Sequence, residues 1–289
     1  MSTVSTFLYY GAPFMPTGRE NNWLIDAVSR PPEIIMNFRT VAMKVTVTNL
    51  RGGNIHPRLD DMGFEKLLIP TQVDQRALSD RLASSVEEYQ IETGALLLSL
   101  TSADAVLFFD ATLRGVDTHT PLAQDVRSAH LRVHVDQNPT SALARAANLG
   151  GPKRRFRRFQ IINVWRPLVE SVRNFPLGLC DYRSVDLSAD LVSTRLNFPP
   201  SLKDRENYSL KFNPKHRWYY WESLSPDEVI IFKCYDSASR DLALVNGETD
   251  QGLIDVAGLC PHTAFFNESG PTKGRLRTSL EVRALLFYE

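Results

Sequence analysis

The chain of 289 residues carries 33 Lys and Arg residues against 33 Asp and Glu residues, so its formal net charge is zero. This balance argues against a surface built to bind nucleic acid or a membrane. No apolar run approaches the roughly 20 residues of a membrane-spanning helix, and an apolar fraction of 43% is enough for a substantial core.

The cysteines and the N-terminal segment indicate the compartment. Cys180, Cys234 and Cys260 are odd in number and lack metal-type spacing, so no disulfide framework is expected. The first residues lack a basic region followed by an apolar stretch, so no secretory signal is expected. These features predict a cytoplasmic protein, and they leave its oligomeric state open.

The first half of the chain is expected to contain most of the helices. Residues 73–91 repeat apolar side chains every three or four positions before Gly94, which predicts one helix. Pro139 begins a short alanine-rich segment that should be helical up to Gly150. Alternating or apolar stretches predict strands at 42–49, 105–113 and 130–136.

The second half is expected to consist mainly of strands. They are predicted at 156–166, 207–212, 216–221, 228–235, 253–257 and 277–288. No internal repeat or low-complexity linker divides the chain, so residues 1–289 are expected to form a single domain. Many strands with short turns and a few flanking helices predict a mainly β fold with a double-stranded β-helix core, the jelly-roll variant that can host iron.

The last predicted strand separates its side chains by chemistry. One face carries Arg277, Ser279, Glu281 and Arg283. The other face carries Leu280, Val282, Ala284, Leu286 and Tyr288. Because side chains alternate along a strand, the apolar face should pack on helices or a sheet. The face with both charge signs is unusual for solvent and is typical of a barrel interior that binds an anion.

Two histidines and one carboxylate are the candidate metal ligands. His134 and Asp136 lie two residues apart on a predicted strand and therefore project to one side, and His262 follows near the C-terminus. Such a set can hold non-haem Fe(II) on one face and leave positions open for a co-substrate and O2. The competing interpretations are an Asp136 that caps the helix after Pro139 and a His262 that is buried with a backbone partner.

Arg277 and Ser279 are the candidate 2-oxoglutarate ligands. An arginine and a hydroxyl two residues apart on a strand can grip one carboxylate together. Arg283 competes on the same face, but Arg277 is preferred for its partner hydroxyl; Arg283 would then pair with Glu281 or bind substrate. One small molecule must connect the iron with this anion site, so the strands of His262 and Arg277 are expected to be neighbours.

Further candidates for the substrate site are aromatic or polar. Asn163 shares an apolar face with Trp165, so a structural hydrogen bond and a role near the co-substrate are both open. Tyr220 lies in an aromatic run at 218–221 that could line a substrate pocket or pack on both faces of a strand, and Phe265 could add an apolar wall. The basic run at 153–158 is expected to be a solvated loop rather than a nucleic-acid site.

Taken in order, these motifs resemble a mostly fungal family of Fe(II)/2-oxoglutarate oxygenases of secondary metabolism, with gibberellin desaturase-like and cephem 7α-hydroxylase-like members. The stretches that carry the resemblance are 134–139, 159–168, 216–220, 227–236, 261–265 and 277–288. The resemblance implies iron at His134, Asp136 and His262, with 2-oxoglutarate at Arg277 and Ser279. Family members hydroxylate, desaturate or close rings, and some similar proteins form an aziridine from valine.

We therefore expect a dioxygenase that uses Fe(II), 2-oxoglutarate and O2 to oxidise an unactivated C–H bond of a small molecule. Two alternatives remain at this point. An iron oxidase could work without 2-oxoglutarate, with Arg277 on a substrate carboxylate, or a jelly-roll protein could bind without catalysis. The order of the triad and the polar face of 277–283 argue against the latter. Stoichiometric succinate release in the presence of substrate would separate the three.

Overall fold

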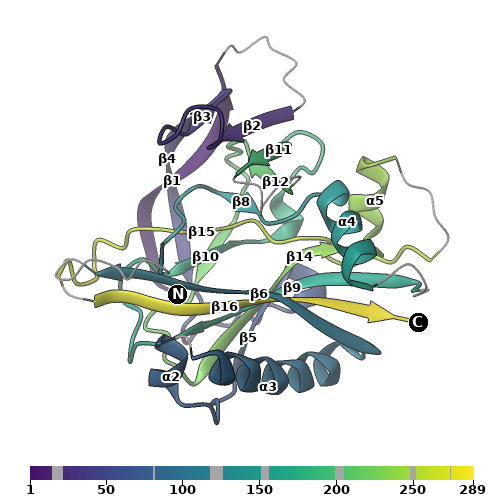
Figure 1. Ribbon diagram of the computed structural model, residues 1–289. Helices are drawn as coiled ribbons and strands as arrows, with labels where there is room; N and C mark the ends of the chain where they lie inside the picture. The colour runs from purple at the N-terminus through teal and green to yellow at the C-terminus, as the bar shows by residue number, and fades with distance from the viewer. Residues whose placement is uncertain are drawn as a thin grey trace.

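The computed structural model describes residues 1–14, 22–80, 82–117, 126–150, 156–198, 205–247, 252–273 and 275–289. Two sheets face each other in this structure (Figure 1). In the described ranges, the larger sheet has the order β1 (Thr3–Pro13), β4 (Phe38–Asn49), β13 (Trp218–Tyr220), β10 (Leu177–Cys180), β15 (His262–Ala264), β8 (His134–Val135), β12 (Arg205–Leu210), β11 (Leu191–Asn197), β2 (Asn22–Asp26) and β3 (Ile35–Met36).

The smaller sheet runs across the middle of the molecule in Figure 1. Its strands have the order β5 (Phe64–Leu68), β14 (Glu228–Asp236), β9 (Arg158–Pro167), β16 (Arg275–Tyr288), β6 (Ala105–Asp117) and β7 (Arg127–Ser128). The helical segments are α1 (Leu59–Met62), α2 (Gln75–Ser79), α3 (Ala83–Thr101), α4 (Pro139–Gly150), η1 (Tyr182–Ser184) and α5 (Arg240–Val245).

The central strand β16 has the two faces that its sequence predicts. Its apolar residues join a core with Leu78 of α2 and with Tyr89 and Leu97 of α3, which cover the outer face of the smaller sheet (Figure 1). Leu285 and Phe287, on the opposite face, belong to the core between the two sheets. The charged residues of β16 therefore point into the space between the sheets, as expected.

The helix predicted at 73–91 is wrong in its bounds. The structure has two helices there, α2 and α3, and α3 continues through Gly94 to Thr101. A Cβ atom on Gly94 would lie 3.3 Å from Val106 and 3.4 Å from Phe108. Gly94 thus permits close packing of α3 on β6 instead of ending the helix. The helix ends at Ser102, whose φ of 56° is left-handed.

Most of the other predicted elements agree with the structure. The predicted helix after Pro139 is α4, and the strands predicted from 42, 105, 156, 228 and 277 onward are present. The strand predicted at 130–136 is shorter, because regular pairing is limited to β8. The segment 253–257 forms only an isolated bridge at Ile254. Residues 153–155 of the basic run at 153–158 lie outside the described residues.

Two further expectations concern cysteines and membranes. Cys180, Cys234 and Cys260 are all buried and free. In the part of the chain that the structure describes, no helix is both long enough and apolar enough to cross a membrane.

A buried charged cluster connects the smaller sheet with α1. The ammonium group of Lys233 on β14 is fully buried and donates to Asp60 at 2.5 Å and to Asp236 at 2.7 Å. Arg158 on β9 also pairs with Asp236. Burial alone would raise the pKa of Asp236, but Lys233 and Arg158 lower it below its usual value. Removal of one partner would leave a buried charge that is only partly compensated.

We predict that Lys233→Met lowers the free energy of unfolding by about 3 kcal/mol. The matched change Lys66→Met removes a partly exposed partner of Glu228 and should cost no more than about 1 kcal/mol. The deficit of Lys233→Met should shrink as the pH falls, because a carboxyl with a lowered folded-state pKa contributes fully to stability above its unfolded pKa of about 3.9 and loses that contribution as the pH falls through the folded-state pKa. Urea titrations at several pH values would measure this, and equal losses in the two variants would contradict it.

Candidate metal centre

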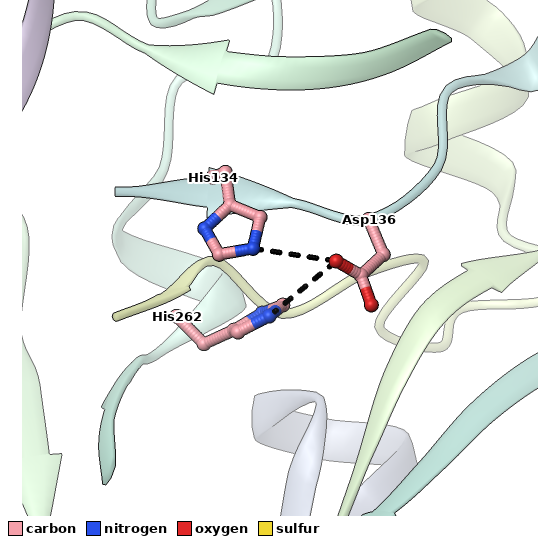
Figure 2. A group of neighbouring side chains, drawn as sticks. All are labelled: His134, Asp136 and His262. Carbon is pink, nitrogen blue, oxygen red and sulfur yellow. Dashed lines mark ion pairs between the residues drawn. The ribbon is translucent and has the colours of Figure 1, made fainter. Parts of the chain in front are cut away.

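The side chains of His134, Asp136 and His262 converge at one point between the sheets (Figure 2). Their convergence follows from strand pairing, because His134 of β8 lies directly opposite His262 of β15. Asp136 follows β8 and projects to the same side as His134, two residues earlier. Val133 and Val135, at the alternate positions, are buried in the core. A sequence separation of more than 120 residues is thus closed by one pair of strands.

The Nε2 atoms of His134 and His262 face Asp136 and are available to coordinate a metal. Nε2 of His134 lies 3.3 Å from Asp136 Oδ1, and Nε2 of His262 lies 3.9 Å from the same oxygen. Each Nδ1 lies within hydrogen-bond distance of a backbone carbonyl, that of Arg132 at 2.8 Å and that of Cys260 at 3.0 Å. A carbonyl can only accept, so each Nδ1 carries the proton and each Nε2 presents a lone pair.

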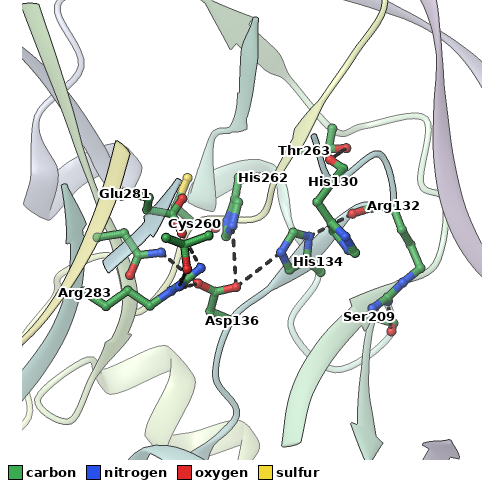
Figure 3. Close-up of polar contacts among 12 residues, drawn as sticks. His130, Arg132, His134, Asp136, Ser209, Cys260, His262, Thr263, Glu281 and Arg283 are labelled. Carbon is green, nitrogen blue, oxygen red and sulfur yellow. Dashed lines mark hydrogen bonds and ion pairs between the residues drawn. The ribbon is translucent and has the colours of Figure 1, made fainter. Parts of the chain in front are cut away.

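The two oxygens of Asp136 have different surroundings (Figure 3). Oδ2 accepts from Asn163 Nδ2 and from Arg283 Nε, both at 2.8 Å. Oδ1 faces the two histidines. The hydrogen bonds to Oδ2 therefore orient the carboxylate and leave Oδ1 available to a metal. Residues next to a metal ligand commonly orient it in this way.

Asp136 does not cap the following helix. Asn138 takes that role, because its Oδ1 accepts from the backbone N–H of Ser141 at 2.9 Å and its own N–H donates to Ser141 Oγ at 3.1 Å. These two hydrogen bonds satisfy the backbone N–H groups of Asn138 and Ser141 at the start of α4. Asp136 is consequently left free to face the histidines.

The protonation states suit a divalent cation. Burial lowers the pKa of His134 to about 4, so its ring is neutral near pH 7. Burial would raise the pKa of Asp136, but Arg283 and the neighbouring histidines hold it well below its usual range. Two imidazoles and one carboxylate on one side of a site form the donor set typical of non-haem Fe(II) oxygenases. The residues present therefore fit an iron ion.

Arg277 and Ser279 lie together on the opposing strand β16. Arg277 is 2% exposed, and it donates to Ser279 Oγ at 3.1 Å and to the Phe175 carbonyl at 2.9 Å. Its guanidinium carbon lies 5.2 Å from the ring centre of Trp165. Among the described residues no carboxylate forms an ion pair with it, and burial lowers its pKa to about 9. A buried cation without a counter-ion is a favourable place for an anion.

One small cavity connects the two groups of residues. Its lining includes His134 and His262 on one side and Arg277 on the other, with Glu281 and Arg283 between them. The strands of His262 and Arg277, which were expected to be neighbours, do not pair with each other, since β15 and β16 belong to different sheets. The two strands instead face each other across the space between the sheets, which brings their side chains together without hydrogen bonds between the strands.

Arg283 has a different environment from Arg277. Its guanidinium group pairs with three carboxylates, those of Asp110, Asp136 and Glu281. The predicted pairing with Glu281 is therefore present, and it is part of a larger network (Figure 3). Arg283 also lines both cavities near the triad, but its charge is already compensated.

A larger cavity of about 650 Å³ is also lined by His134 and Asp136. Its walls combine arginines with apolar side chains from β2, β3 and β11. Most of its lining residues were not among the sequence candidates, and Arg114, His130, Arg145 and Arg205 are examples. His130 could have been found from the sequence, because it shares the alternation of His134 and Asp136. In the structure its ring lies 4.3 Å, centroid to centroid, from the ring of His134. The arginines carry no local signal.

The remaining sequence candidates lie behind the site rather than on its surface. Asn163 is fully buried and holds Asp136, while its own Oδ1 has no partner among the described residues. Trp165 lies under Arg277. Tyr220 and Phe265 pack edge to face at 5.3 Å. None of these four is among the described residues that line the two cavities.

Comparisons of sequence point to one enzyme class. A family profile described as "Oxidoreductase/YMDC permease-like domain" matches residues 15–287. "Hydroxylase/desaturase efuI" of Hormonema carpetanum is 30% identical over 274 residues, which cover 85% of this chain and 83% of that protein. "Fe(II)/2-oxoglutarate-dependent dioxygenase nvfI" of Aspergillus novofumigatus is 28% identical over 265 residues, which cover 89% of this chain and 88% of that protein.

A solved structure supports the fold. The "iron and alpha-ketoglutarate-dependent endoperoxidase NvfI" superposes with a TM-score of 0.83 at 23% identity, over 99% of this chain and 98% of that one. The predicted double-stranded β-helix is thereby confirmed. The chain belongs to the family of non-haem Fe(II)/2-oxoglutarate-dependent oxygenases that includes these fungal hydroxylases and desaturases, enzymes whose cofactors are Fe(II), 2-oxoglutarate and O2.

Proposed function

We propose that His134, Asp136 and His262 hold the Fe(II) ion and that Arg277 with Ser279 binds the distal carboxylate of 2-oxoglutarate. The observation that carries this proposal is the small cavity with metal-type ligands on one wall and a buried, uncompensated arginine on the other. A short dicarboxylic acid has anionic groups at both ends, so it matches both walls at once. Fe(II) bound there would supply the oxidising chemistry that breaks an unactivated C–H bond.

The protein residues contribute position and charge. Carbonyls of Arg132 and Cys260 orient the two rings, and Arg283 with Asn163 orients the carboxylate. Arg277 would fix the far end of the co-substrate, and Trp165 beneath it keeps that end away from water. The site is thus arranged before its ligands bind, which reduces the cost of ordering them.

The larger cavity is the proposed substrate site. Its volume of about 650 Å³ falls in the usual range for small molecules, and its walls are the side chains of one pocket rather than an extended charged surface. We infer a secondary-metabolism substrate that is hydroxylated, desaturated or cyclised, with an amino acid such as valine, converted to an aziridine, as one candidate. Asn163, Trp165, Tyr220 and Phe265 would support this pocket from behind, and Arg283 would border it.

We further propose that the chain acts in the cytoplasm on a free metabolite, not on nucleic acid, and that residues 1–289 fold as one domain. The zero net charge supports the proposal that the substrate is not nucleic acid. The proposal of one domain is supported by the contribution of both halves of the chain to each sheet. One cooperative unfolding transition, seen alike by several probes, would test the domain proposal.

The metal proposal predicts that His134→Ala, Asp136→Asn and His262→Ala each lose bound iron and activity. Loss of a ligand should lower iron affinity by more than the 10–100-fold that loss of a supporting residue typically costs. His56→Ala, at an exposed histidine, is the matched control and should keep its iron. Iron per protein after anaerobic loading and desalting is the measurement. Full iron content in any of the three variants would remove that residue from the site.

The co-substrate proposal predicts different effects for the two arginines of β16. Arg277→Gln should weaken 2-oxoglutarate binding by tenfold or more, because each lost 1.4 kcal/mol is about tenfold and a charged hydrogen bond is worth about 1.5–3 kcal/mol. Ser279→Ala should have a smaller effect. Titration of the visible charge-transfer band of the Fe(II)–2-oxoglutarate complex would measure this without turnover. A loss in Arg283→Gln alone, with none in Arg277→Gln, would reverse the assignment.

The substrate proposal predicts that a small molecule stimulates succinate release well above the uncoupled background. A broad panel that includes free amino acids, one peptide and one oligonucleotide would be assayed with equal protein and saturating 2-oxoglutarate. Succinate formed in proportion to oxidised small molecule supports both the use of 2-oxoglutarate and the substrate class. Efficient oxidation of the peptide or oligonucleotide, with only background release from the small molecules, would contradict it.

A further inference from the structure

The larger cavity is lined by more arginines than carboxylates. Its lining contains the arginines Arg114, Arg127, Arg132, Arg145, Arg205 and Arg283. The carboxylates in the same lining are Asp110, Asp136 and Glu206. Of the arginines, Arg283 is compensated by its carboxylate partners. The remaining cations therefore outnumber the carboxylates that are free to pair with them.

Arg145 and Arg205 are the cations most available to a ligand. Arg145 projects from α4 and Arg205 begins β12, two elements that pack together. The guanidinium carbon of Arg145 lies 4.1 Å from the ring centre of Phe109, and its buried Nε has no hydrogen-bond partner among the described residues. In the same described part of the chain, no carboxylate forms an ion pair with Arg145 or Arg205.

The nearby carboxylates are already engaged. Asp110 accepts from Arg283 and, at 3.0 Å, from the Thr112 hydroxyl. Glu206 accepts from Asn138 at 2.6 Å. Neither lies within ion-pair distance of Arg145 or Arg205 in the structure, so these two cations face the cavity without a fixed counter-ion.

The two arginines line one cavity with the candidate metal ligands, and their charges affect each other. Burial, together with the charges of Arg205 and Arg283, lowers the pKa of Arg145 to about 10. Burial also lowers the pKa of Arg205, and the charges of Asp110 and Asp136 act on both residues in the opposite direction. Both groups remain cationic near pH 7. Two like charges that repel each other in a partly dry pocket are stabilised when an anion binds between them.

An apolar wall of the cavity begins beside Arg205, because Leu196 lies directly across from it in the pairing of β11 with β12. Ile25 and Met36 continue this wall across β2 and β3, and Phe198 also lines the cavity. A ligand that fills the cavity would therefore meet cations and, next to them, a hydrocarbon wall that extends away from Arg205. Its reactive carbon would lie near His134 and Asp136, which also line this cavity.

The anion that these arginines would bind is not 2-oxoglutarate. Its proposed place is the small cavity lined by Arg277, and neither Arg145 nor Arg205 is part of that lining. Both arginines line only the larger cavity among the two. An anion held by them would therefore be a second ligand, bound at the same time as the co-substrate.

We propose that the substrate carries an anionic group, a carboxylate or a phosphate or sulfate ester, on an apolar skeleton, and that Arg145 and Arg205 bind this group. The inference rests on the proposed function, because it assigns the larger cavity to the substrate. It adds to that function a charge requirement and two residues that determine specificity.

The test uses the full chain loaded anaerobically with Fe(II) and 2-oxoglutarate. The probes are 4-phenylbutyrate, 3-phenylpropyl phosphate and 3-phenylpropyl sulfate, with 4-phenylbutanol as the neutral counterpart of similar size. Calorimetric titration gives the affinity of each probe in the wild type, in Arg145→Gln, in Arg205→Gln and in the double variant. Arg76→Gln, an exposed arginine on α2 below the smaller sheet, is the matched control (Figure 1).

We expect at least one anionic probe to bind the wild type about tenfold or more tightly than the alcohol. This preference should fall by about tenfold in each single variant, disappear in the double variant and persist in Arg76→Gln, while the affinity for the alcohol stays constant. The probe with the largest preference identifies carboxylate, phosphate or sulfate as the group. Failure of every anion to exceed the alcohol, or a preference that survives the double variant, overturns the inference. The charge-transfer band in the same samples reports binding of iron and 2-oxoglutarate independently of probe binding. Failure of the proposed metal and co-substrate sites can therefore be distinguished from failure of the proposed anion site.

Discussion

The ion pair between Arg283 and Asp136 is the contact on which the arrangement of the site depends. Arg283 belongs to β16 in the smaller sheet, and Asp136 follows β8 in the larger one, so the pair joins the two sheets at the metal centre. Asp110 and Glu281 compensate the same guanidinium. A buried charge network of this kind is tolerated when all its members are satisfied, and it then fixes one geometry. The carboxylate of Asp136 is therefore held in place by protein residues alone.

The three candidate ligands are oriented from both sheets. The histidine rings are anchored by carbonyls of their own strands, whereas the carboxylate is anchored by Asn163 and Arg283 from the sheet opposite. Correct ligand geometry thus depends on how the two sheets pack, in addition to the local strand conformation. The same packing brings Arg277 across from His262, although their strands do not pair. One interface between sheets accordingly sets both the metal site and the distance to the anion site.

Local alternation explains how much of this could be predicted from the sequence. A strand with one buried face has only one register that satisfies both faces, so the apolar and charged sides of β16 could be assigned residue by residue. The spacing of His134 and Asp136 carried the same information. The pairing of His262 with His134 could not be derived this way, because it joins segments 128 residues apart. The C-terminal end of α3 was predicted too early because Gly94 signals a helix end locally, while its real role is close packing on β6.

The arginines around the site were the hardest residues to interpret, because their roles depend on counter-ions supplied by distant segments. Arg283 has three carboxylate partners and orients a ligand. Arg277 is equally buried but has only a hydroxyl and a carbonyl, so it requires an anion from outside the protein. Arg145 and Arg205, which line the larger cavity, likewise have no ion-pair partner among the described residues. Under the proposed assignments, co-substrate and substrate would each be held by a charged end in a cavity that borders the candidate metal ligands, and this would fix which C–H bond faces the iron.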